Sequence, residues 1–195
     1  MAHASDTRLV VLHALRLKGM ADAAEIARAS DRAQPVVEAE LTELLAHGMV
    51  RFLDKRDSWS LTPEGRAEHA RLLRTDIDRA GCIAVVESAY RRILGVNVEL
   101  LATITALQQG APGVERLRAV HHDALGATEE LAVELERMQS YGPRLAAALE
   151  RVEAGEREWV ARPLMDSYHT VWHELHEDLL LTLGIDRSAE QEVRT

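Results

Sequence analysis

Cysteine and aromatic residues are scarce in this sequence of 195 residues, which holds one cysteine and 4% aromatic residues. A single cysteine excludes an internal disulfide framework and a zinc module built from several cysteines. The low aromatic content, beside abundant Ala, Leu, Glu and Arg, favours helices over a β-sandwich. The sequence also lacks any run of about 18 uncharged apolar residues, so we predict no membrane-spanning helix.

The first ten residues, MAHASDTRLV, lack the charged and then apolar order of a secretory signal. Apolar residues make up 47% of the chain, which is enough for a core in one ordinary domain or two small ones. We therefore expect a soluble, cytoplasmic and mainly α-helical protein with no membrane partner.

The net charge is unevenly distributed along the chain. Residues 1–80 hold 12 Lys and Arg against 13 Asp and Glu, a net −1, and residues 81–195 hold 11 against 19, a net −8, which together give −9. Phosphates repel the second half, whereas a nearly neutral half can approach a polyanion through a local basic face. If the protein contacts nucleic acid, it does so with its first 80 residues.

The first half begins with three predicted helices. Apolar spacing predicts a helix over Thr7–Lys18, and the stretch Asp22–Glu25 has the pattern of a capping box for a short helix over Ala23–Ala29. A third helix is predicted from near Pro35, which is tolerated in a first turn, to His47. We expect one face of this third helix to be apolar, with Val37, Leu41, Leu44 and Leu45.

The apolar period then changes from 3.6 to 2 residues, which predicts short, half-buried strands. The alternating apolar residues are Val50, Phe52, Trp59 and Leu61. The charged stretch 54–57 between them predicts a turn. Thr62 as N-cap and Pro63 in the first turn then predict a helix over Pro63–Arg79.

This order of elements is that of a winged helix-turn-helix. The segments ELLAHGMV at 43–50 and WSLTPEGR at 59–66 resemble the MarR group of bacterial regulators. In that group a leucine-rich recognition helix ends in a Gly-hydrophobic-Val step, and the wing leads into Leu-Thr-x-x-Gly-Arg. The resemblance covers roughly residues 7–80. It implies a DNA-binding domain over residues 1–80, built from three helices plus a β-hairpin.

The resemblance also implies which side chains contact double-stranded DNA. The third helix would enter the major groove with Arg32, Gln34, Glu38 and Thr42. The hairpin would bring Lys55 and Arg56 to the phosphate backbone or minor groove, with Arg51 and Arg66 supporting the same face.

The charges of the third helix leave a second interpretation open. The helix carries Glu38, Glu40 and Glu43 and no cation after Arg32, and acidic residues flank the two cations of the hairpin. The alternative is therefore a winged helix that serves as a protein-interaction or regulatory module and does not bind DNA.

Gly81 marks the start of a second domain, over residues 81–195, which we predict to be an all-α antiparallel helical domain. Gly and Pro residues, which interrupt helices, divide this half into predicted helices over Cys82–Leu94, Asn97–Gln108, Val114–Met138, Pro143–Val160 and Pro163–Leu183. The polar tail Asp186–Thr195 is predicted to be frayed. A winged helix followed by a wholly helical part resembles the PadR regulators, or GntR regulators with an all-helical effector domain.

The third helix of the second half carries a heptad pattern, which favours packing along another helix. Its residues are Val114, Leu117, His121, Ala124, Thr128, Leu131, Leu135 and Met138. Because winged-helix regulators usually bind two half-sites as dimers, we predict that this domain forms a homodimer. The alternative is a seam within one chain.

Histidines are frequent near the C-terminus, where the last predicted helix places His169, His173 and His176 beside an apolar face. We predict a pocket for a small-molecule effector, lined by His121, Tyr168, Trp172 and His176. Two alternatives remain open: a metal ion held by His169 and His173 at i, i+4 spacing, and plain core and surface roles. No cofactor is predicted.

The sequence contains no P-loop, no G-x-S-x-G and no dinucleotide-binding fingerprint, so we do not expect an enzyme. Glu174, Glu177 and Asp178 are interpreted as a solvated helix face. The favoured hypothesis is a homodimeric DNA-binding transcriptional regulator whose helical domain senses a small molecule.

Overall fold

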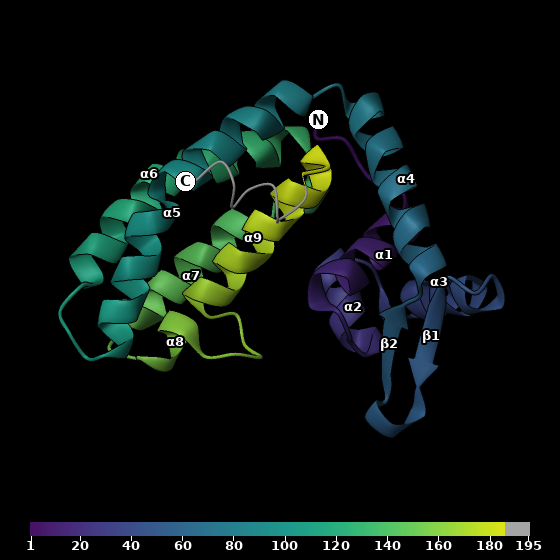
Figure 1. Cartoon of the computed structure of the whole chain (residues 1–195), viewed down its shortest axis with the longest axis horizontal. Helices are drawn as coiled ribbons and strands as arrows, with labels where there is room; N and C mark the ends of the chain where they lie inside the picture. Colours follow the sequence, from purple (N-terminus) through teal and green to yellow (C-terminus); the bar gives the residue numbers. More distant parts are fainter. Residues whose placement is uncertain (186–195) are drawn as a thin grey trace. The chain divides into compact units, whose positions relative to one another are not determined.

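A computed structural model describes residues 1–185 of the chain, and the predicted frayed tail at 186–195 lies outside the described residues. The chain divides into two compact units, shown in Figure 1. The N-terminal unit comprises His3–Gly81, and the helical unit comprises the residues from Cys82 onward together with Met1–Ala2. Each unit is described by itself below.

The N-terminal unit contains three helices, a two-stranded antiparallel sheet and a long fourth helix. Its elements are α1 (Thr7–Lys18), α2 (Ala23–Ser30), α3 (Gln34–Ala46), β1 (Val50–Leu53), the 3₁₀ turn η1 (Asp54–Arg56), β2 (Ser58–Leu61) and α4 (Pro63–Ala80). The predicted helices and strands of this half are confirmed to within two residues at each end.

Local capping explains why these helices begin where they do. The Asp22 carboxylate accepts a hydrogen bond from the Glu25 backbone N–H at 2.8 Å, and the Glu25 side chain accepts one from the Asp22 N–H at 3.1 Å. The Thr62 hydroxyl accepts from the Gly65 N–H at 3.0 Å at the start of α4. Each cap satisfies a helix N–H that otherwise has no partner, which contributes about 1 kcal/mol.

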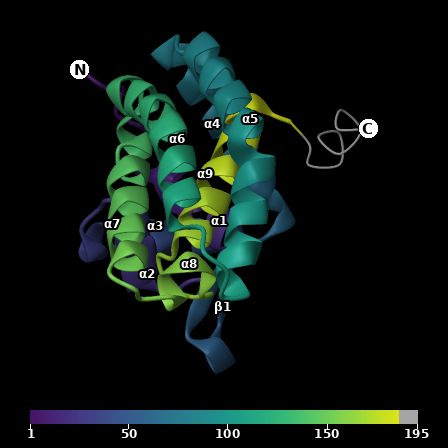
Figure 2. The same cartoon turned by 90° about the vertical axis from the view of Figure 1, so that its left-hand side faces the viewer.

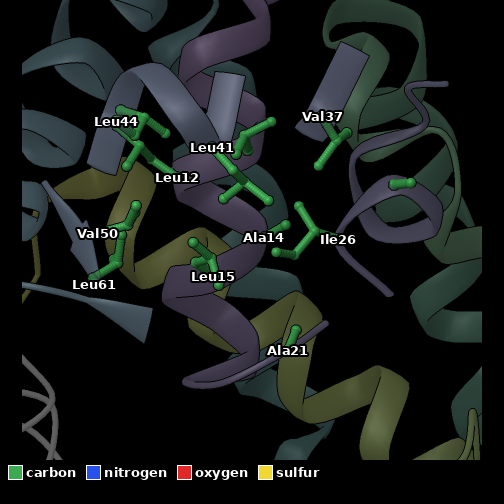
Figure 3. Packing of buried hydrophobic residues seen from close by; sticks show 12 residues of the cluster. Leu12, Ala14, Leu15, Ala21, Ile26, Val37, Leu41, Leu44, Val50 and Leu61 are labelled. Carbon is green, nitrogen blue, oxygen red and sulfur yellow. The ribbon is translucent and has the colours of Figure 1, made fainter. Parts of the chain in front are cut away.

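The core of this unit lies where α1, α2, α3 and the base of the hairpin meet (Figure 3). The buried residues that form it include Leu12, Leu15, Ile26, Val37, Leu41, Leu44, Val50 and Leu61. Burying each large apolar side chain contributes roughly 1.5–3 kcal/mol. The core therefore fixes the position of α3 and of the strand ends nearest to it.

The predicted alternation of the hairpin is only partly correct. Val50 and Leu61 pair and are buried, but Phe52 is 37% exposed and Ser60 is buried. Trp59 is partly buried and packs against the core, and its backbone exchanges hydrogen bonds with that of Ala21 at 2.8 and 3.2 Å. The ring of the exposed Phe52 packs on that of Trp59, with centroids 5.0 Å apart.

Between residues 82 and 185, the helical unit contains four longer helices and two short ones (Figure 2). Its elements are α5 (Ile83–Gln108), α6 (Val114–Glu134), the 3₁₀ turn η2 (Glu136–Met138), α7 (Tyr141–Glu153), α8 (Glu158–Ala161) and α9 (Tyr168–Leu183). Helix α5 packs against α6 and α9, and α7 packs against the same two helices. The structure thus confirms a mainly helical chain with a small two-stranded sheet.

Several predicted helix boundaries in this unit are wrong. The helix predicted over Val114–Met138 ends at Glu134, because Leu135 is extended and a 3₁₀ turn follows it. One continuous helix, α5, passes through Gly95, because a single glycine in a long helix costs only about 1 kcal/mol. The helix predicted over Pro143–Val160 ends before Gly155, which has a φ of +89°. The last helix begins at Tyr168 and not at Pro163, since Leu164 adopts a φ of +63° that helices do not use.

The predicted heptad seam of α6 is buried inside one chain. Its buried residues are Leu117, Ala124, Thr128, Leu131, Leu135 and Met138. Helix α6 packs against α5 and α7 of the same unit. The seam is therefore intrachain, and it gives no support to the predicted homodimer.

Among residues 1–185, the helices are all too short or too polar to cross a membrane.

Candidate functional sites

The outward face of α3 is the first candidate site. Its inner residues Val37, Leu41 and Leu44 are each 0% exposed, which holds the helix against the core. A short turn precedes it, in which Asp31 adopts a left-handed φ of 50°. Leu45, predicted on the buried face, is instead 46% exposed, because it lies one residue beyond the core-facing Leu44 on a helix that turns 100° per residue.

The four residues of α3 and its preceding turn that were predicted to contact DNA do not form one cationic face. The Arg32 guanidinium donates to the Ser5 carbonyl at 3.2 Å and to the Asp31 carbonyl at 3.0 Å. The Gln34 amide donates to the Glu38 carboxylate at 2.8 Å. The Thr42 hydroxyl donates to the Glu38 backbone carbonyl at 2.9 Å. Gln34, Glu38 and Thr42 are exposed, so α3 presents a polar surface with an acidic group at its centre.

The tip of the β1–β2 hairpin is the second part of this surface. Lys55 and Arg56 are both exposed in the η1 turn, which extends beyond the helices of the unit in Figure 1. The turn is held by the Ser58 hydroxyl, which donates to the Arg56 carbonyl at 2.6 Å, and by Asp57, whose φ is 46°. A short, anchored turn therefore presents two cations to solvent.

Arg51 and Arg66, the two arginines predicted to support this surface, are both exposed but differ in their side-chain hydrogen bonds. Arg51 is exposed, but its Nε donates to the Ser60 hydroxyl at 3.0 Å across the strand pair. Arg66 is exposed on the first turns of α4. An additional exposed cation, Arg28 on α2, was not among the predicted contacts, although its place beside the α2–α3 turn is visible in the sequence.

The residues predicted to bind an effector belong to the core of the helical unit. Tyr168 is 0% exposed and its hydroxyl lies 3.3 Å from the His121 Nδ1, while Trp172 Nε1 donates to the Asn97 amide oxygen at 2.9 Å. His176 is buried, with its ring centroid 6.1 Å from that of Tyr90. A ligand there would have to replace these contacts, so the effector pocket stays a prediction that the packing does not favour.

The two histidines considered for a metal ion occupy different environments. His169 is half-buried, whereas His173 is exposed. Over residues 1–185 there is no group of three or more His, Cys, Asp or Glu side chains arranged to hold a metal ion.

The half-buried histidines give the helical unit a predicted pH dependence. Burial lowers the pKa of His121 and of His169 below the usual 6.5. The unfolded chain therefore takes up protons at a higher pH than the folded chain, so the free energy of unfolding should fall as the pH drops below about 6.5. We expect urea titrations at pH 7.5 and pH 5.5 to show this loss, and His121→Gln to reduce it. An unchanged difference in His121→Gln would contradict the assignment.

A buried ionic network joins α7, α9 and η2, and the sequence analysis missed it. Arg137 forms an ion pair with Asp178 and also donates to the Thr182 hydroxyl at 2.8 Å, and the Tyr141 hydroxyl donates to Asp178 at 3.0 Å. The Asp178 side chain is 1% exposed. Burial and the neighbouring Asp178 raise the pKa of Tyr141, so its hydroxyl stays protonated and can donate.

A second buried carboxylate continues this network. Arg144 donates to Glu174 at 2.7 Å and to Asp166 at 2.8 Å, and although burial opposes it, these carboxylates raise the Arg144 pKa. The interpretation of Glu174 and Asp178 as a solvated face is therefore wrong, since Glu174 is 8% exposed and Asp178 is buried. The spacing in the sequence could have indicated this: Glu174, Asp178 and Thr182 follow one another at intervals of four residues, and so share one face of the helix.

Comparison of the chain with models of protein families, with curated proteins and with solved structures found no match.

Proposed function

We propose that the N-terminal unit is a winged helix-turn-helix that binds double-stranded DNA, and that the protein is a transcriptional regulator. The order of its elements supports this proposal, because α2, a short turn and α3 precede a hairpin that returns into a long helix. In this proposal α3 lies in the major groove and the hairpin lies along the backbone.

One observation carries the proposal: an anchored hairpin tip with two exposed cations stands beside a helix whose outer face is open to solvent. Lys55 and Arg56 gain from neutralising phosphates, because each neutralised phosphate releases counterions. The net charge supports the assignment to this unit, since residues 1–80 carry −1 and residues 81–195 carry −8. The predicted effector residues give no such support, because Tyr168 and Trp172 are packed in a core.

The test of this function is the salt dependence of binding to a duplex of arbitrary sequence. We expect the logarithm of the association constant to fall linearly with the logarithm of the salt concentration, and the variant Lys55→Ala/Arg56→Ala to lower that slope by about 2. The matched control is Arg157→Ala/Arg162→Ala, which removes two exposed cations from the helical unit and should leave the slope unchanged. Fluorescence anisotropy of a labelled duplex measures both.

The exposed residues of α3 support a second candidate function for this unit, that of a protein-interaction module. The exposed charged side chains of α3 are the carboxylates Glu38 and Glu43, and Val36 and Leu45, on opposite edges of the helix, are each 46% exposed. Exposed carboxylates suit a basic protein segment better than phosphates. The same titration separates the two functions: the absence of any duplex binding at low salt would replace the DNA-binding proposal by this one.

A further inference from the structure

The carboxylate of Glu38 is oriented by a neighbour on the outer side of α3. The Gln34 amide, one turn earlier in the helix, donates to the Glu38 Oε1 at 2.8 Å. Both side chains are exposed, and within residues 1–185 the Glu38 carboxylate accepts no other hydrogen bond. Because a carboxylate accepts at both of its oxygens, the second one, Oε2, is left for a group outside the protein.

The other polar groups of this surface are directed back to the protein. The Thr42 hydroxyl gives its single proton to the Glu38 backbone carbonyl at 2.9 Å. The Arg32 guanidinium, just before the helix, donates to the Ser5 carbonyl at 3.2 Å. The strongest hydrogen-bonding group that α3 presents to solvent on this side is therefore the Glu38 carboxylate, which is an acceptor.

Glu38 is the one carboxylate of α3 on this side of the helix. Glu40 is engaged by the Arg8 Nε at 2.7 Å, and Glu43 lies about 140° from Glu38 on a helix that turns 100° per residue. The adjacent Ala39 is exposed and adds only a methyl group. The major groove of DNA admits an α-helix, and such a small side chain lets α3 lie close to the base edges beside Glu38.

A carboxylate discriminates among the bases because it accepts hydrogen bonds and cannot donate them. In the major groove, guanine presents two acceptors, N7 and O6, which repel a carboxylate, whereas cytosine presents a donor, its N4 amino group. Adenine has a donor at N6 but an acceptor beside it at N7, so it is the poorer match of the two donor bases. Phosphates also repel the carboxylate. Glu38 therefore favours a duplex only where a cytosine lies opposite its free oxygen.

We propose that Glu38 is a specificity-determining residue that selects cytosine by accepting a hydrogen bond from its N4 amino group, with Gln34 as the positioning residue that orients the carboxylate. This inference rests on the proposed function, because it requires α3 to lie in the major groove. It differs from the commonest arrangement, in which an arginine contacts guanine, since Arg32 is turned toward Ser5. The DNA that the unit binds then carries a cytosine on the base edges that face Glu38.

The first test is the selection of binding sequences by the full-length chain from a library of randomised duplexes. We expect the wild type to enrich a motif with one position at which cytosine is preferred over guanine by at least about tenfold. Glu38→Gln keeps the side-chain length but adds a donor, so it should move the preference at that position to adenine, which an amide contacts through N6 and N7.

Two further variants complete the selection experiment. Gln34→Ala removes the group that orients the carboxylate and should reduce the cytosine preference by about twofold. The matched control is Glu150→Gln, which neutralises an exposed carboxylate of the helical unit and should retain the wild-type motif.

A modified base tests the contact atom itself. N4-methylcytosine still pairs with guanine, but it carries a methyl group where the amino hydrogen faced the major groove. In the selected duplex this base should weaken wild-type binding by about tenfold and leave the binding of Glu38→Ala unchanged, because that variant has no contact to lose. The same modified base outside the motif is the control and should change neither. Fluorescence anisotropy of the labelled duplexes measures each dissociation constant.

The outcomes separate this inference from the proposed function. Guanine at the selected position, a motif that is unchanged in Glu38→Gln, or an equal effect of N4-methylcytosine on the wild type and on Glu38→Ala would each overturn the role of Glu38 while DNA binding persists. The absence of any duplex binding at low salt would instead overturn the proposed function, and this inference with it.

Discussion

Replacing Asp178 by alanine should lower the free energy of unfolding of the helical unit by about 3–5 kcal/mol. The carboxylate is buried and joins three groups: the Arg137 guanidinium, the Tyr141 hydroxyl and the Thr182 hydroxyl. Its removal leaves the Arg137 charge without its partner at a side-chain exposure of 5%. An uncompensated buried charge costs more than the lost contacts, because water cannot solvate it.

The double variant Arg137→Met/Asp178→Leu separates this cause from a simple packing defect. It removes both charges and keeps the volume apolar, so it should recover most of the stability lost in Asp178→Ala. Asp123→Ala deletes an exposed carboxylate of the same unit and should change the stability by about 0.5 kcal/mol or less. Hydrogen-exchange mass spectrometry on peptides from residues 135–185 reports this unit separately. Equal losses in Asp178→Ala and in Asp123→Ala would contradict a structural role for the network.

This network shows why part of the helical unit could not be predicted. Charged residues are almost always solvated, so composition assigns Glu174 and Asp178 to the surface. Their burial depends on Arg137 and Arg144, which lie more than 29 residues earlier and become partners only after α7 and α9 pack together. Periodicity identifies which residues share a helix face, but it does not identify which helix covers that face.

The same limit applies to the heptad pattern of α6. This seam was predicted to pack along a helix, and it does, but periodicity alone left open whether that helix belongs to the same chain. The continuity of α5 was missed because Gly95 was taken as a helix end. By contrast, the N-terminal elements follow local signals such as the Asp22–Glu25 capping box and the Thr62 cap, which need no distant partner.

For the candidate DNA surface, the sequence predicted which segments are exposed, but it did not predict the hydrogen-bond partners of their side chains. The charged turn predicted the exposed Lys55 and Arg56, because a turn between two strands faces solvent. Side-chain partners were not predictable: Arg32 donates to the carbonyl of Ser5, which lies 27 residues away in the chain. The exposed Leu45 was misplaced because it borders the apolar stripe of α3.

Gly65→Ala should be the most damaging small substitution in the N-terminal unit, with an expected loss of about 3 kcal/mol in its free energy of unfolding. A Cβ on Gly65 would lie 1.9 Å from the Met49 carbonyl oxygen and 2.9 Å from its carbon. These are backbone atoms, and that carbonyl already accepts hydrogen bonds from the Thr62 N–H at 3.1 Å and the Thr62 hydroxyl at 3.0 Å. No rotamer change relieves the overlap, so α4 and the hairpin must separate.

Gly95→Ala is the matched control, since it makes the same substitution in a helix with open space around the new methyl group. Alanine favours helix over glycine by up to about 1 kcal/mol, so the control should stabilise the helical unit. Hydrogen exchange of peptides from residues 49–80 should quicken in Gly65→Ala, with those from residues 83–108 unchanged. Duplex binding should weaken in the same variant, because the Lys55 and Arg56 turn loses its fixed position relative to α3. Unchanged protection of residues 49–80 would show that the contact between Gly65 and Met49 does not hold the hairpin in place.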